Sequence, residues 1–147
     1  MDLSADMLAA VAATASDRGL GNLQTVESAA ETLPFDDGAF DFLACRYSAH
    51  HWGDLEGGIR QARRVLKDGS PAVFIDAVAA GSALADTHLQ AVELLRDTSH
   101  VRDYSPAEWM AMLARTGFTV ESTRMFRVRM DFKVWICLLY TSPSPRD

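Results

Sequence analysis

The stretch Glu31–Trp52 reads ETLPFDDGAFDFLACRYSAHHW, and the segment RRVLKDGS follows it at 63–70. Pro34 predicts a turn, because proline fixes its own φ and disfavours helix at the residue before it. The short apolar run Phe40–Cys45 predicts a strand that is buried on both faces. Polar and aromatic residues follow that run, and an amphipathic helix then ends at Gly69. A buried strand, a polar cluster and a helix in this order are typical of an α/β fold.

Hydrophobic spacing on either side of this stretch predicts further alternating helices and strands. The expected helices are 4–17, 55–66, 83–96 and 105–117, the last opening with a capping box at Ser105 and Glu108 and with Pro106 in its first turn. The expected strands are 23–27, 40–45, 71–78, 118–123 and 126–135. The last two are separated by about two residues and are expected to form a hairpin. The predicted fold is therefore α/β, with a mostly parallel sheet and a C-terminal antiparallel hairpin.

The composition indicates one domain and excludes several classes of protein. The chain has 147 residues, of which 48% are hydrophobic and 23% charged, and it lacks an apolar run of the roughly 20 residues that a membrane helix needs. A formal net charge of -6 argues against nonspecific binding to nucleic acid. Asp2 and Asp6 stand where a signal peptide would carry basic residues. We therefore expect a cytoplasmic protein without a membrane span.

The last eleven residues need a separate explanation. Residues 137–147 read CLLYTSPSPRD, which is the translation of a widely used transposon-derived sequencing adaptor. We interpret them as an artefact and leave them out of the fold prediction. Cys45 is then the one native cysteine, so neither a disulfide nor a cysteine metal site is expected.

The LPF turn, the strand leading into RYSAHHW and the helix ending in RVLKDG together resemble the second half of a class I S-adenosylmethionine-dependent methyltransferase domain. The resemblance is strongest to the branch of ubiquinone and menaquinone C-methyltransferases. It implies a partial Rossmann-like sheet in which the opening MDLSADML follows the second strand. On this interpretation, residues 1–136 are the C-terminal part of the domain. The first two strands and the glycine-rich cofactor loop are missing, and the chain by itself is inactive.

The resemblance also implies a site for S-adenosylmethionine. It assigns Asp2 to the cofactor ribose, because a carboxylate can accept hydrogen bonds from both hydroxyl groups. Many relatives carry Asp at the position of Ala29, where it contacts adenine, so adenine is expected here to meet backbone groups near Ala30 and Glu31, with apolar packing from Met7. The predicted cofactor-binding residues are Asp2, Leu3, Met7, Ala29, Ala30, Glu31 and Arg46.

The segment after the 40–45 strand is expected to face the transferred methyl group. His50 and His51 titrate near neutral pH and are the candidate catalytic bases, although adjacent residues rarely point the same way, so at most one is expected to act. His51 matches a histidine that many relatives carry at this turn, where it can also simply hold the loop. The predicted contacts to the acceptor are Tyr47, Trp52, Asp76, His100 and Tyr104.

Two other interpretations remain open. A different nucleotide-binding enzyme is possible because one fold hosts many reactions, although neither Tyr47 nor Tyr104 has the lysine four residues later that a short-chain dehydrogenase needs. The second is a domain that keeps the methyltransferase shape only to bind a partner or a metabolite. The leading prediction is methyl transfer from S-adenosylmethionine to a small, partly apolar acceptor, with no metal and no nucleic acid involved. The oligomeric state stays open.

Overall fold

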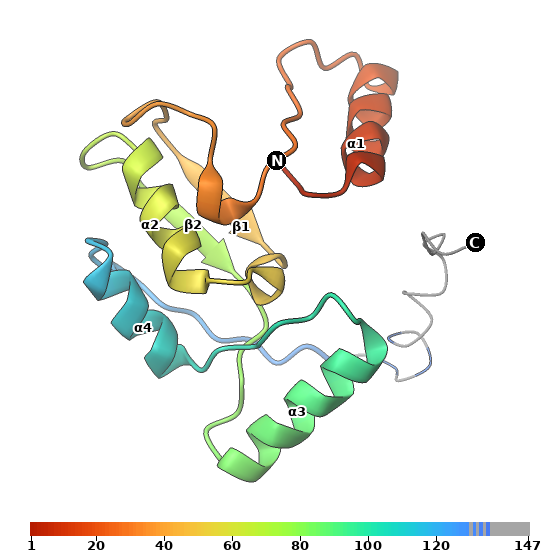
Figure 1. The fold of residues 1–147 in the computed structure, drawn as a ribbon, viewed down its shortest axis with the longest axis vertical. Helices are drawn as coiled ribbons and strands as arrows, with labels where there is room; N and C mark the ends of the chain where they lie inside the picture. Colours follow the sequence, from red (N-terminus) through yellow and green to blue (C-terminus); the bar gives the residue numbers. More distant parts are fainter. Residues whose placement is uncertain (130, 132, 134, 136–147) are drawn as a thin grey trace.

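The computed structural model describes residues 1–129, 131, 133 and 135 (Figure 1). In chain order the elements are α1 (Ala5–Asp17), the 3-10 turn η1 (Ala30–Thr32), β1 (Leu43–Arg46), the 3-10 turn η2 (Ala49–His51), α2 (Leu55–Val65), β2 (Ala72–Ile75), α3 (Ala83–Arg96) and α4 (Pro106–Arg115). The strands β1 and β2 pair in parallel, with Leu43 opposite Ala72 and Arg46 opposite Ile75. Because α2 connects two parallel strands, the predicted α/β class is confirmed.

Helices α2 and α4 cover one face of this small sheet and form the core. Leu55 and Ile59 of α2 are 1% and 0% exposed, and they cluster with Trp109 and Met112 of α4. Phe74 of β2 packs against the same cluster, with its ring centroid 5.7 Å from that of Trp109. The amphipathic helix predicted at 55–66 is therefore confirmed as α2, and its apolar side packs onto the sheet.

The opposite face of the sheet is open within the described residues. Burial alternates along both strands, and Val73 and Ile75 are 41% and 47% exposed. The prediction that the 40–45 strand is buried on both faces is therefore wrong for β1. Within the described residues, alternate residues of β1 and β2 face the core, and the residues between them are exposed.

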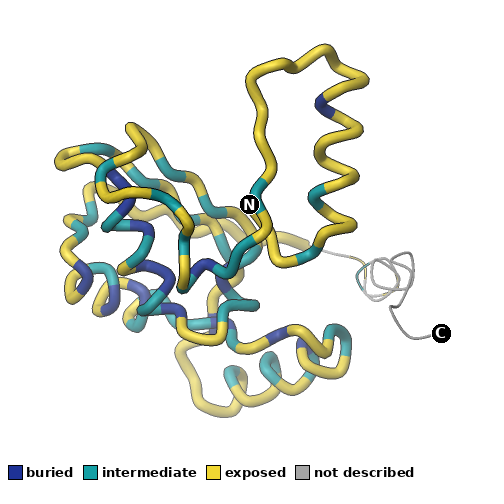
Figure 2. The backbone as a smooth tube through the Cα atoms, turned by 45° about the horizontal axis from the view of Figure 1, so that its top comes forward, coloured by how far each residue is buried: buried dark blue, intermediate teal, exposed yellow. Residues whose placement is uncertain are grey.

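Local signals account for the helix ends. The Ser4 hydroxyl accepts a hydrogen bond from Met7 N at the start of α1, and Ser105 and Glu108 form the predicted capping box of α4. The predicted helices are confirmed to within a residue or two. Helix α1 nevertheless stands apart from the sheet, and Ala15 is its one buried residue (Figure 2).

Two of the predicted strand regions differ from the structure. The 23–27 strand is reduced to one parallel bridge between Asp2 and Glu27. Residues 118–129 form no strand, so the predicted hairpin is wrong there: Phe118 instead packs on the core, and its amide donates to Leu113 O over 2.9 Å at the end of α4. Positions 130, 132 and 134 of the second hairpin strand, and the whole segment 137–147, lie outside the described residues.

Candidate functional site

The candidate site lies at the carboxyl ends of β1 and β2. After β1, Tyr47 N donates to Ile75 O over 2.8 Å and continues the parallel ladder, and Tyr47 itself has a φ of 51°. This left-handed conformation redirects the chain into η2. Asp76 directly follows β2. Because parallel strands end at the same edge of a sheet, Asp76 meets η2 there.

Asp76 holds both the backbone of η2 and the His50 side chain. One carboxylate oxygen, Oδ2, accepts from Ala49 N at 2.8 Å and from His50 N at 3.3 Å. The other, Oδ1, lies 2.6 Å from His50 Nδ1 and also accepts from Ala77 N at 2.9 Å. The side chains of His50 and Asp76 are 13% and 4% exposed. Since an ionised carboxylate can only accept, Nδ1 of His50 carries the proton and Nε2 is the free basic nitrogen.

The surroundings of His50 change its pKa in opposite directions. Burial lowers the pKa of His50, but the hydrogen bond and charge of Asp76 raise it, and the carboxylates of Asp103 and Glu93 add to that rise. The net result is a pKa above the ordinary value for histidine. His50 is therefore a stronger base than an isolated imidazole, held in one orientation by a buried carboxylate.

His51 has a different set of partners. Its Nδ1 lies 3.1 Å from both Ser99 O and Ser99 Oγ. Ser99 Oγ also lies 2.6 Å from an oxygen of Asp97, to which it donates, so both Ser99 oxygens accept from His51. The rings of His50 and His51 have centroids 4.1 Å apart, but His51 ties η2 to the 97–99 turn.

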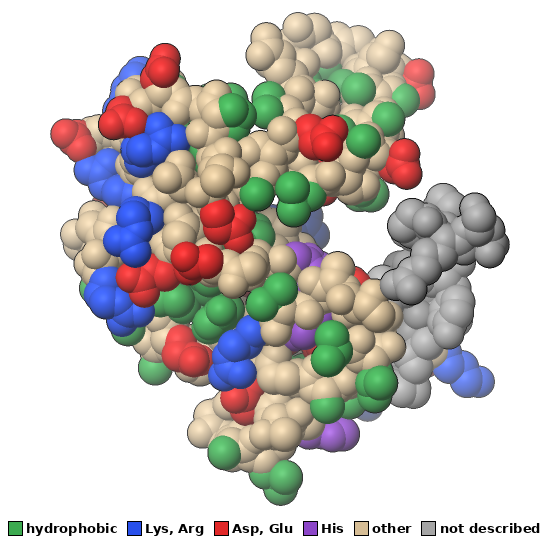
Figure 3. All heavy atoms as spheres, viewed as in Figure 1, with side chains coloured by type: hydrophobic (Ala, Val, Ile, Leu, Met, Phe, Trp, Pro, Cys, Tyr) green, Lys and Arg blue, Asp and Glu red, His purple; other side chains and the backbone are tan. Residues whose placement is uncertain are grey.

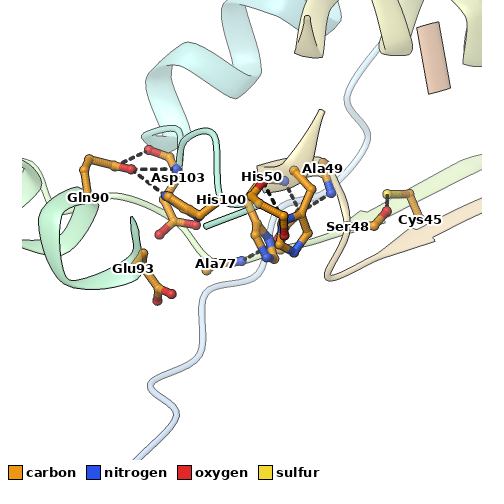
Figure 4. A network of polar contacts seen from close by, with 12 residues as sticks. Cys45, Ser48, Ala49, His50, Ala77, Gln90, Glu93, His100 and Asp103 are labelled. Atoms are coloured by element: carbon orange, nitrogen blue, oxygen red, sulfur yellow. Dashed lines mark hydrogen bonds and ion pairs between the residues drawn. The ribbon is translucent and has the colours of Figure 1, made fainter. Parts of the chain in front are cut away.

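The turn between α3 and α4 brings a further polar group to His50 (Figure 4). His50 O accepts from Val101 N at 2.9 Å and from Arg102 N at 3.1 Å, and the His100 ring centroid lies 5.7 Å from that of His50. Asp103 follows in this turn and is 1% exposed. Burial and the nearby carboxylates of Glu93 and Asp76 raise the pKa of Asp103, and the two histidines partly offset this rise.

Sequence reasoning found His100 but missed Gln90, Glu93 and Asp103. Gln90 and Glu93 are single polar residues on a helix, and Asp103 stands in a turn between Arg102 and Tyr104. None of the three belongs to a motif with a fixed spacing. The α3–α4 turn brings them to His50 through tertiary contacts, which no local pattern records.

Within the part of the chain that the structure describes, His50, Asp76 and Asp103 form the one group of donors that could hold a metal ion. One donor atom from each lies within 4.8 Å of the others. However, His50 Nδ1 and Asp76 Oδ1 are 2.6 Å apart, whereas two ligands on one metal stand roughly 3 Å apart at bond lengths of about 2.0–2.2 Å. The pair is therefore arranged to share a proton.

The predicted cofactor residues lie at the start of the chain and beside η1. Asp2 N donates to Val26 O at 3.3 Å and Asp2 O accepts from Ser28 N at 3.1 Å, which brings Asp2 next to the segment that leads to Ala29–Glu31. Asp2 Oδ1 also accepts from Ser4 N at 2.9 Å. The exposed members of the predicted set are Asp2, Leu3, Met7 and Arg46, and the one buried member is Ala30.

The other predicted acceptor contacts have mixed surroundings. Tyr47 is 50% exposed, with the Arg46 guanidinium 5.1 Å from its ring centroid. Trp52 packs against the core and against Gly58, where a Cβ would meet the indole at 2.4 Å. Tyr104 packs on the same core, and burial raises the pKa of its hydroxyl. Tyr47 is therefore the most open of the three.

Comparison with known proteins places this chain in a family. Residues 1–74 match the family described as "Methyltransferase domain". The chain is 41% identical over 146 residues to the "Uncharacterized protein YafE" of Escherichia coli K12, covering 99% of this chain and 70% of that protein. The chain belongs to the methyltransferase family. No helix in the described residues is both long and apolar enough to cross a membrane.

Solved structures agree with this assignment. The methyltransferase chain superimposes on YcgJ from Bacillus subtilis with a TM-score of 0.90 at 30% identity, over 96% of this chain and 60% of YcgJ. It also matches a Thermotoga maritima protein described as a SAM-dependent methyltransferase and possible histamine N-methyltransferase, with a TM-score of 0.58 at 27% identity, over 74% of this chain and 51% of that one. The chain thus spans about half to three fifths of the length of these two structures.

Proposed function

We propose that the protein to which this chain belongs transfers a methyl group from S-adenosylmethionine to a small, partly apolar acceptor, with His50 as the general base. The observation that carries this proposal is the contact between His50 Nδ1 and Asp76 Oδ1, 2.6 Å at the carboxyl ends of two parallel strands. Ligands of open α/β sheets bind at this edge. The family supports the reaction class.

The described residues fit S-adenosylmethionine in two respects. Asp2 offers an exposed carboxylate at a bridged backbone position, where it can accept from the two ribose hydroxyls. The Ala29 side chain does not cap η1, which leaves the amides at the start of that turn without a side-chain partner and able to meet adenine. The cofactor, when bound, supplies the methyl group as an electrophilic sulfonium.

His50 is better placed than His51 to act as the base. Asp76 orients the His50 ring and stabilises the imidazolium that forms when Nε2 takes a proton. His51 uses its Nδ1 to hold Ser99 and has no carboxylate on its ring. The other contribution of the chain is alignment, because methyl transfer is an in-line displacement that depends on the geometry of the two reactants. Tyr47 and His100 are the candidate residues for positioning the acceptor.

A binding-only role is the second candidate, and the Ala29 position favours it. Ala29 gives η1 no side-chain hydrogen bond, so the aspartate contact to adenine that the family resemblance implies at this position is missing here. The two functions differ in a simple way. An enzyme binds S-adenosylmethionine and consumes it, whereas a binding domain retains it unchanged.

The test uses the full-length protein, by which we mean the gene product that contains this chain. Calorimetric titration measures the binding of S-adenosylmethionine, and transfer of a labelled methyl group to a panel of small acceptors measures turnover. We expect binding together with transfer. His50→Asn should keep the affinity for the cofactor and lose transfer. Binding without transfer to any acceptor would favour the binding-only role, and the absence of cofactor binding would contradict both.

A further inference from the structure

Two buried hydrogen-bond acceptors near His50 lack a donor. Among the described residues, His100 Nδ1 and Asp103 Oδ2 are buried side-chain atoms without a hydrogen-bond partner. His100 and Asp103 are 7% and 1% exposed. Native proteins rarely leave such atoms unpaired, because each loses its hydration on burial. Both atoms therefore indicate that a partner is absent.

The hydrogen bonds of Gln90 show whether the absent partner is a donor or an acceptor. Its Nε2 donates to Asp103 O at 2.8 Å and its Oε1 accepts from Asp103 N at 3.0 Å, which settles the orientation of the amide. The same Oε1 lies 3.0 Å from His100 Nε2, so this nitrogen carries the ring proton. Burial lowers the pKa of His100, which favours the neutral ring. His100 Nδ1 is thus an acceptor, like Asp103 Oδ2, and the partner that satisfies both must be a donor.

The charges of the cluster indicate that this donor is a cation. Three carboxylates face His50, and two of them are already paired: Asp76 with His50 itself, and Glu93 with Arg96 at 2.8 Å. Arg102, next to Asp103 in sequence, binds Asp86 at 3.0 Å instead. Asp103 is therefore the buried carboxylate without a cation. Burial without a cation raises the pKa of Asp103, so a positively charged group placed there would favour the carboxylate form and be held by it.

We propose that the acceptor is a cationic amine whose ammonium group docks on Asp103 and His100, next to His50. This proposal rests on the methyl transfer proposed above and names the class of its substrate. A primary ammonium group has three N–H donors, enough to donate to both acceptors. One carboxylate oxygen of Asp103 lies within 4.8 Å of one ring nitrogen of His50 and one oxygen of Asp76, so an amine bound to Asp103 lies near His50.

An ammonium acceptor held by Asp103 and His100 is chemically compatible with His50 as the base. An ammonium nitrogen has no lone pair, so His50 Nε2 must first remove one proton and become imidazolium, which Asp76 stabilises. The freed nitrogen lone pair then forms the new N–C bond to the methyl carbon while the C–S bond breaks. The bonding electrons stay on sulfur, and the cofactor leaves as neutral S-adenosylhomocysteine. An alcohol acceptor would meet the same base but would leave the Asp103 charge unpaired.

The experiment compares matched acceptors in the full-length protein. The probes are phenethylamine and its neutral isostere 2-phenylethanol, each titrated by calorimetry into the protein saturated with S-adenosylhomocysteine and each assayed for transfer of labelled methyl. We expect the amine to bind at least tenfold more tightly than the alcohol and to carry the label on nitrogen. Equal affinities, or the label on oxygen or carbon, would overturn the proposal. Cofactor binding together with methyl transfer to the neutral acceptor would contradict the amine proposal, but it would still support methyl transfer as the function.

Two variants and a chelator test the role of the carboxylate. Asp103→Asn should raise the dissociation constant of phenethylamine by roughly ten- to a hundredfold, as expected for loss of a charge-assisted bond, and leave that of the cofactor unchanged. Asp68→Asn, which removes an exposed carboxylate paired with Arg63 outside this cluster, should change neither. Unchanged amine affinity in Asp103→Asn would contradict the proposal. Loss of amine binding after treatment with EDTA would also contradict it, because a bound metal ion would then be the missing cation.

Discussion

The two sides of the proposed site are built very differently. On the acceptor side, His50 and Asp76 are nearly buried, and Asp76 holds η2 through both backbone and side-chain hydrogen bonds. On the cofactor side, Leu3 and Met7 are 68% and 55% exposed, and α1 has one buried residue (Figure 3 shows apolar side chains on its surface). This chain therefore fixes the geometry of the proposed base firmly, while Asp2, Leu3 and Met7 of the proposed cofactor side are open to solvent.

The difference has a physical origin. The acceptor side rests on a packed core, where α2 and α4 cover the sheet and the α3–α4 turn closes over η2. The cofactor side rests on one parallel bridge, Asp2 with Glu27, and on a helix formed by local signals such as the Ser4 cap. We expect substitutions on the acceptor side to change turnover, and those on the cofactor side to change affinity for S-adenosylmethionine.

The largest effect is expected from replacing His50 of η2, with its neighbour His51 as the control. His50→Asn removes the base and should lower turnover in the full-length protein by about 10²- to 10⁴-fold. His51→Asn is the matched control, because it breaks the contact to Ser99 but leaves the pair of His50 and Asp76 intact. Steady-state rates of both variants, at saturating cofactor, give the comparison. Equal losses in the two variants would show that η2 matters as a folded turn and not for its base.

A smaller effect is expected on the cofactor side. Asp2→Ala removes the carboxylate proposed to accept from the ribose hydroxyls, and the dissociation constant of S-adenosylmethionine should rise by roughly ten- to a hundredfold. Calorimetric titration of the full-length protein measures this change. Asp6→Ala, one turn away in α1, is the control and should leave the affinity within a factor of two or so. Unchanged affinity in Asp2→Ala would remove Asp2 from the site.

The smallest effect concerns the core beneath η2. Ala at position 58 would place its Cβ 2.4 Å from the Trp52 ring, so Gly58→Ala should lower the free energy of unfolding by about 1–3 kcal/mol. Gly81→Ala, with nothing within 4 Å of the added Cβ, should leave stability nearly unchanged. Denaturant unfolding of both variants makes the comparison. A Gly58→Ala protein as stable as the parent would mean that Trp52 moves aside freely.

The sequence predicts the helices well, and it places His50 at the end of a strand, because these features are local. Caps such as Ser4 and Ser105 mark where helices start, and His50 follows a recognisable strand. Strand pairing is less predictable, since residues 118–129 carry an alternating pattern but find no partner strand in the described chain. Asp103 is the clearest miss: its burial and its nearness to His50 depend on the α3–α4 turn, which is a tertiary contact.

The central claim is that Asp76 tunes and orients His50 as the base, and the pH dependence of turnover tests it most directly. His50 must be neutral to accept a proton, so kcat/KM should rise with pH through its pKa, which Asp76 raises above the ordinary value of about 6.5. Asp76→Asn removes the carboxylate charge and should lower that pKa, which moves the acidic limb of the profile to lower pH whatever the remaining rate. An acidic limb that stays at the same pH in Asp76→Asn, or moves to higher pH, would contradict the account.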